Sequence, residues 1–214
     1  MREQFAGKDL RNARKRFSAA MEGAKSVIDQ VPVLPGEEFL NLLYYLLCDG
    51  YRTAVSIEVL VQQGLSDPDL GIPAESVEVL GRQILERTVF SSYTRKHPAR
   101  IVDRMLKTSA CQWKRSWKES ADKAAEELKV QILPHTAQMA RELGGDLGEA
   151  WKRLSYLSHP RGGRSYSLVE LARGLDRGLS SEEFFSRRVQ RILPWLADWL
   201  TMLTSNFSDA QESQ

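Results

Sequence analysis

The sequence has very little cysteine and no long apolar stretch. Only two of the 214 residues are cysteines, Cys48 and Cys111, which are too few for a disulfide framework or a cysteine-rich zinc site. The longest apolar run covers residues 39–48, about half the roughly 20 residues that a transmembrane helix needs. The first 17 residues are rich in charge and lack the apolar core of a secretory signal. We therefore expect a cytoplasmic protein with no membrane partner.

The familiar motifs of enzyme active sites are also missing. The chain contains no GxGxxG or GxxxxGK[ST] phosphate loop, no GxSxG nucleophile elbow and no HExxH zinc motif. Its three histidines, His97, His135 and His159, are 38 and 24 residues apart, which is not the spacing of metal ligands on one helix. The sequence therefore predicts neither a metal nor a cofactor.

Charge is distributed unevenly along the chain, although 30 basic and 28 acidic residues leave a net charge of only +2. Residues 26–81 carry nine acidic residues and one basic residue, whereas residues 82–123 carry eleven basic and four acidic residues. Residues 1–25 are again basic, with seven basic and three acidic residues. Two interpretations follow: either acidic and basic helices pair side by side, or a basic face binds a polyanion such as RNA.

Helical periodicity runs through the whole chain, and no segment alternates as a strand does. The pattern predicts an all-α fold, a single bundle of six to eight helices. We expect a basic N-terminal helix and a proline-rich connection in residues 1–36, the bundle in residues 37–206 and a polar tail in residues 207–214. The expected helices of this scheme cover residues 8–29, 37–63, 74–96, 99–109, 112–143 with a break at Pro134, 147–158, a short stretch after Ser167, and 181–205.

Glycine, proline and capping residues predict where several helices begin, end or bend. Gly144-Gly145 ends one helix, and Asp146 can cap the next. Ser180 and Glu183 fit a capping box. Gly64 is expected to stop the second helix, which we expect to bend near Asp49-Gly50 and, because residues 39–48 are apolar nearly all round, to be buried on every side.

Arg82 and Glu86 are the first candidate pair of functional residues. They lie four positions apart in the segment GRQILERTVF, so a helix brings them to one face. One interpretation is an ordinary surface or half-buried ion pair. The other is a polar pair at the centre of the bundle that supports a site residue by orienting it.

Arg153 and His159 form the second pair, in the segment AWKRLSYLSHPRGGR. This Arg-x5-His spacing resembles the HEPN superfamily of helical bundles, which is common in prokaryotic toxin and phage-defence systems. The Arg82–Glu86 pattern upstream of an LS-x3-H-type segment is similar to a poorly characterised bacterial branch of HEPN-like proteins. The resemblance implies a HEPN-like bundle and a metal-independent ribonuclease, with Arg153 and His159 catalytic and a homodimer bringing two sites together.

The chemistry of this pair suits RNA cleavage without a metal. A histidine can move protons at neutral pH, and an arginine can stabilise the charge on a phosphate. Six steps along a regular helix leave positions 153 and 159 about 120° apart, so the two side chains converge only if the helix ends before His159, which Pro160 favours. Arg161 and Arg164, beside two glycines, are candidates for binding the RNA phosphates.

Several alternatives remain open at this point. His159 can be a loop or capping histidine, and the Arg161–Arg164 loop an exposed turn. Trp113 and Trp117, which alternate with basic residues, suit either stacking on RNA bases or a core stripe. The alternative function is a non-catalytic helical module that dimerises or binds a protein partner, such as an antitoxin.

Overall fold

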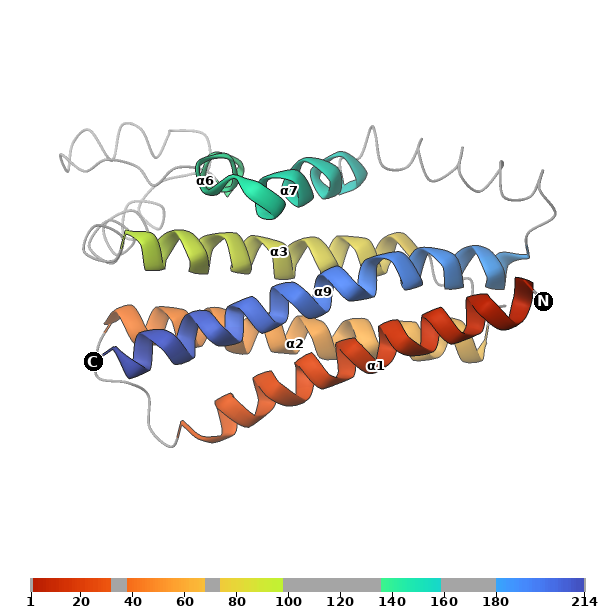
Figure 1. The fold of residues 1–214 in the computed structure, drawn as a ribbon, viewed down its shortest axis with the longest axis horizontal. Coiled ribbons are helices and arrows are strands. Elements are labelled where there is room, and N and C mark those ends of the chain that lie inside the picture. The colour runs from red at the N-terminus through yellow and green to blue at the C-terminus, as the bar shows by residue number, and fades with distance from the viewer. Residues whose placement is uncertain (1, 32–37, 68–73, 98–135, 159–179, 214) are drawn as a thin grey trace, which may run out of the picture.

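The computed structural model describes residues 2–31, 38–67, 74–97, 136–158 and 180–213. Within these ranges every element is a helix, so the predicted all-α class is confirmed for the described part of the chain (Figure 1). The six helices of these ranges are α1 (Arg2–Asp29), α2 (Glu38–Ser66), α3 (Ala74–Lys96), α6 (Thr136–Leu143), α7 (Gly145–Ser158) and α9 (Ser181–Glu212).

Four long helices form the body of the structure. The helices α2, α3 and α9 contact one another in all three pairs, and α1 packs along α9 and α2. The short helices α6 and α7 pack on α3. Figure 1 shows that α1, α3 and α9 run in one direction and α2 runs in the other. Phe17 and Ala24 of α1 are fully buried, so the basic N-terminal helix is part of the same core as residues 37–206.

The predicted boundaries hold best where strong local signals mark them. Helix α3 covers Ala74–Lys96, as predicted. Gly144 and Gly145 have φ values of 65° and 55°, which is the left-handed conformation that glycine adopts most easily, and they lie at the junction where α6 ends and α7 begins. The capping box of Ser180 and Glu183 is present at the start of α9. Asp146 lies inside the first turn of α7, which begins one residue before it.

The predicted polar tail is wrong as a structural element. Helix α9 continues to Glu212, seven residues beyond its predicted end. Leu203, Phe207 and Ala210 are all buried, and their spacing continues the apolar stripe of the helix. The stripe therefore holds the last two turns against the core, although the residues between its members are polar.

The predicted stop at Gly64 is also wrong, because α2 continues through this residue to Ser66. Gly50 lies inside the same helix, and the bend expected there stays a prediction. A Cβ atom at Gly64 would lie 2.5 Å from Cζ of Phe185, and one at Gly50 would lie 2.7 Å from Cδ1 of Leu203. Both contacts are with α9. These glycines therefore permit close packing of two helices and do not break α2.

Helix α2 is not buried on every side as predicted. Leu43 and Leu47 are buried, whereas Tyr45 is 70% exposed. Because α1, α3 and α9 contact only part of the helix surface, an outward stripe of α2 remains uncovered. The apolar run at residues 39–48 thus contains more hydrophobic surface than the core takes up.

A buried ion pair joins the beginnings of α3 and α9. Arg188 donates from Nε to Oε1 of Glu78 at 2.9 Å and from Nη2 to Oε2 at 2.5 Å. The two side chains are only 10% and 13% exposed. The guanidinium also lies 5.5 Å from the ring centre of Phe184. Such a two-pronged contact fixes the relative position of the two helices as well as their distance.

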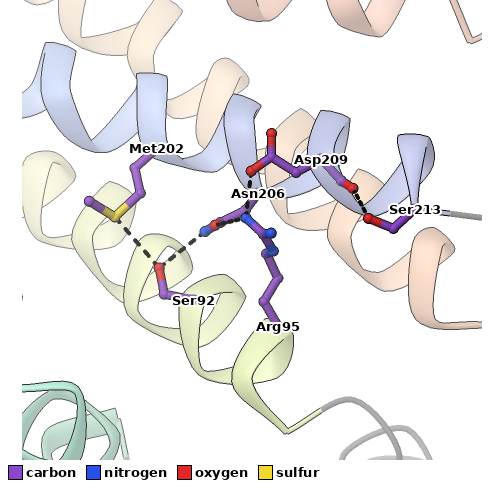
Figure 2. A network of polar contacts seen from close by, with 6 residues as sticks. All are labelled: Ser92, Arg95, Met202, Asn206, Asp209 and Ser213. Carbon is purple, nitrogen blue, oxygen red and sulfur yellow. Dashed lines mark hydrogen bonds and ion pairs between the residues drawn. The ribbon is translucent and has the colours of Figure 1, made fainter.

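A second polar network joins the ends of the same two helices (Figure 2). Arg95 donates to Oδ1 of Asn206 at 3.2 Å and to Oδ2 of Asp209 at 2.8 Å. Asn206 in turn donates to Oγ of Ser92 at 3.0 Å, and Ser92 donates to the sulfur of Met202 at 3.5 Å. Asn206 is only 7% exposed, so its amide needs these partners.

Candidate functional site

The structure describes the predicted site residues unequally. Arg82 and Glu86 are described in full, and Arg153 lies on α7. His159, Arg161 and Arg164 lie outside the described residues, as do Trp113 and Trp117. The candidate site residues that the structure describes thus lie on α3 and α7.

Arg82 and Glu86 form a half-buried ion pair on the side of α3 that faces α7. Nε of Arg82 donates to Oε1 of Glu86 at 3.1 Å, and the side chains are 27% and 36% exposed. The guanidinium carbon lies 5.2 Å from the ring centre of Trp151 on α7, a cation–π contact. The ordinary ion-pair interpretation is therefore confirmed, and the pair does not lie at the centre of the bundle.

The register of α7 separates this pair from position 153. Trp151 is 8% exposed and contacts Arg82 of α3. Each residue advances a helix by about 100°, so position 153 lies about 200° around the axis from position 151. Position 153 also lies one turn after Glu149, whose side chain is 75% exposed. It therefore lies on the side of α7 that faces away from α3 and from the Arg82–Glu86 pair.

Two ion pairs join the basic segments of the sequence to the acidic segment at residues 26–81. Arg14 of the basic N-terminal segment bonds Glu58 of the acidic segment at 2.6 Å, and Arg87 bonds Asp49 at 2.5 Å. In the described part of residues 82–123, Arg82 pairs instead with Glu86 of its own helix, and Arg95 pairs with Asp209 of α9. Pairing of acidic and basic helices is thus confirmed there, while residues 98–123 lie outside the described ranges.

Two pKa shifts reflect burial and local hydrogen bonding. Partial burial, with the neighbouring thiol of Cys48 as the second cause, raises the pKa of Tyr44 above its ordinary value. Hydrogen bonds from Gln138 and from Tyr93 of α3 lower the pKa of Glu142. The leading causes of both shifts are thus burial and neighbouring side chains on α2, α3 and α6.

Two kinds of site can be examined directly in the described residues. No group of three or more histidine, cysteine or acidic side chains there is placed to hold a metal ion. Nor is any helix of these ranges long and apolar enough to cross a membrane.

Comparison of the chain with family models, with curated proteins and with solved structures gives no significant match.

Sequence reasoning missed the exposed apolar face of α2. Tyr45, Val55 and Val59 are 70%, 41% and 47% exposed. Val55 and Val59 lie outside the apolar run at residues 39–48. Tyr45 lies inside that run, which was expected to be buried. The signal that could have found this face is helical spacing, because Tyr45, Val55 and Val59 lie ten and four positions apart and so share one side of a helix.

Proposed function

We propose that the chain is a metal-independent endoribonuclease of the HEPN type, acting as a toxin or phage-defence effector. Arg153 and His159 are its catalytic residues, and Arg161 and Arg164 bind RNA phosphates. The register of α7 supports this proposal, because position 153 lies about 200° around the helix axis from Trp151, the residue that contacts Arg82 of α3.

The proposed reaction needs only groups that this chain and RNA supply. His159 takes the proton of a ribose 2′-hydroxyl, and the freed oxygen attacks the adjacent phosphorus. Arg153 stabilises the negative charge that grows on the phosphate oxygens. The bond to the 5′-oxygen breaks and this oxygen takes a proton from water, while His159 returns its proton to water, which leaves a 2′,3′-cyclic phosphate and a 5′-hydroxyl. A protein partner that covers the site, such as an antitoxin, would restrain the activity.

Cleavage of RNA by the purified chain in EDTA tests this function. We expect His159→Ala and Arg153→Ala each to reduce cleavage by about 100-fold or more, the usual contribution of a positioned acid–base or charge-stabilising group. Lys152→Ala is the matched control, because Lys152 is exposed and bonds only its neighbour Glu149 in the described contacts.

Circular dichroism of each variant separates lost chemistry from lost folding. A wild type that cleaves no RNA in a broad panel contradicts the ribonuclease proposal. Equal cleavage by the wild type and both variants removes Arg153 and His159 from the site.

The exposed face of α2 favours a second candidate function. Three exposed apolar side chains, Tyr45, Val55 and Val59, lie along one helix, and surfaces of this kind often bind another protein. A helical module that acts only by binding would keep this face and lack cleavage in EDTA. The cleavage assay therefore discriminates between the two candidates.

A further inference from the structure

One side of α2 carries a regular stripe that no described helix covers. The stripe, which we call the α2 seam, consists of Tyr45, Cys48, Arg52, Val55 and Val59. Its spacings of three, four, three and four residues are those of the contact positions in a two-stranded coiled coil. Three of its members are apolar and more than 40% exposed, and Arg52 is exposed as well.

The remaining sides of α2 are already occupied. Gly50 touches Leu203 of α9, Asp49 pairs with Arg87 of α3, and Glu58 pairs with Arg14 of α1. By helical register Gly50 lies about 160–200° from the seam members at positions 48 and 52. The seam therefore faces away from α9, which lies in front of α2 in Figure 1.

We propose that the α2 seam binds a second copy of this chain, with the two α2 helices antiparallel and a two-fold axis near residue 50. In this register Tyr45 faces Val55 of the partner subunit, since each lies five positions from the axis. Cys48 faces Arg52 of the partner subunit, since each lies two positions from it. Two-fold symmetry repeats every contact, so one apolar stripe with a polar centre is sufficient for both sides of the interface.

The charges at the centre favour a second copy as the occupant. Arg52 is exposed and has no ion-pair partner among the described residues, whereas Asp49 remains 47% exposed although it accepts a bond from Arg87. In the antiparallel register Arg52 lies opposite position 48 of the partner subunit. It is therefore about one residue along the helix from the partner subunit's Asp49, which carries the opposite charge. A parallel pair would instead place Arg52 against Arg52 of the partner subunit, which is repulsive.

The affinity follows from the size of the seam. Its 15 residues from Tyr45 to Val59 span about 21 Å of helix, and the interface is small by the standards of stable dimers. We therefore expect a dissociation constant in the micromolar range, with fast exchange between monomer and dimer. This inference does not depend on RNA cleavage, and its tests use no RNA.

Sedimentation equilibrium of the full chain is the first test. The wild type should move from 24.3 kDa toward twice that mass as concentration rises through the micromolar range. Val55→Glu and Val59→Glu should each weaken association by about tenfold or more, because each places a charge in the seam. Ala19→Glu, on the exposed side of α1, should leave it unchanged. A wild type that stays monomeric, or a dimer that tolerates both seam variants, overturns the proposal.

Disulfide formation then tests the register. In a Cys111→Ser background, Arg52→Cys should give a covalent dimer on oxidation, because the introduced thiol faces Cys48 of the partner subunit. Adding Cys48→Ser should abolish this product. A covalent dimer that persists without Cys48 would join the two introduced thiols and overturn the antiparallel register. No covalent dimer in either variant contradicts the proposed interface.

Discussion

Replacing either member of the Glu78–Arg188 pair should destabilise the protein far more than its surface ion pairs suggest. The pair links α3 to α9 through two hydrogen bonds, and both side chains are nearly nine-tenths buried. Removing one charge leaves the other in a poorly solvated environment without its main counter-charge. We therefore expect the loss to be set by desolvation of the remaining partner.

The magnitude follows from burial and geometry. Breaking a buried ion pair costs about 3–5 kcal/mol, and the residual exposure of 10% and 13% places this pair toward the lower end, at about 3 kcal/mol. An exposed pair contributes about 0–1 kcal/mol. The Lys152–Glu149 pair is the matched control, with side chains 67% and 75% exposed. We thus expect a severalfold difference between the two sites.

Urea unfolding of the variants measures this difference. Arg188→Met and Glu78→Gln should each lower the free energy of unfolding by about 3 kcal/mol. The double variant should lose less than the sum, with a coupling of about 2 kcal/mol, because neither side then keeps a buried charge. Lys152→Met should change the free energy by less than about 1 kcal/mol. Additive losses, or a loss at Arg188 no larger than that at Lys152, would refute the reasoning.

Three further predictions concern packing, pH and the attachment of α7. Gly64→Ala should lower the free energy of unfolding by about 1–3 kcal/mol because its Cβ meets a buried ring, while Gly23→Ala, which meets nothing within 4 Å, should raise it by up to about 1 kcal/mol in thermal or urea unfolding. The pKa of Tyr44 is raised in the folded protein, so the unfolded chain loses the phenol proton at a lower pH than the folded chain does. The contribution of Tyr44 to the free energy of unfolding is therefore full below about pH 10 and is lost as pH rises through the folded-state pKa. Tyr44→Phe should reduce this loss of stability at alkaline pH, and a variant with the same pH dependence as the wild type would contradict the prediction. Arg82→Ala should speed hydrogen exchange of the α7 amides by roughly fivefold through loss of its cation–π contact, while Lys152→Ala leaves α7 exchange unchanged.

Local sequence signals predicted where helices begin and end far better than they predicted the contacts between helices. The bounds of α3 were predictable because Pro73 stands just before it and His97-Pro98 just after it. Gly64 misled the prediction because a glycine weakens an isolated helix, and only the tertiary structure supplies the ring of Phe185 that needs the space. The end of α9 was missed because its last buried residues are separated by polar ones.

The candidate site shows the same division. The spacing of Arg82 and Glu86 predicted their ion pair, since residues four apart meet on any helix. Their contact with Trp151 joins segments far apart in sequence, and no local pattern contains that information. The charge of the N-terminal segment was visible in the sequence, but its partner Glu58 depends on how α1 crosses α2.

The place of α9 in the bundle has a consequence for synthesis of the chain. This helix follows α1, α2 and α3 in the sequence, yet it contacts all three of them. The core residues of those three helices therefore remain partly uncovered on the ribosome until α9 has emerged, and nascent chains stopped before it expose the apolar surface that α9 later covers. Contacts of such long sequence separation also slow folding. A release of the chain before α9 is complete should yield an aggregation-prone product, and chaperones that bind apolar segments should engage the nascent chain until α9 has emerged.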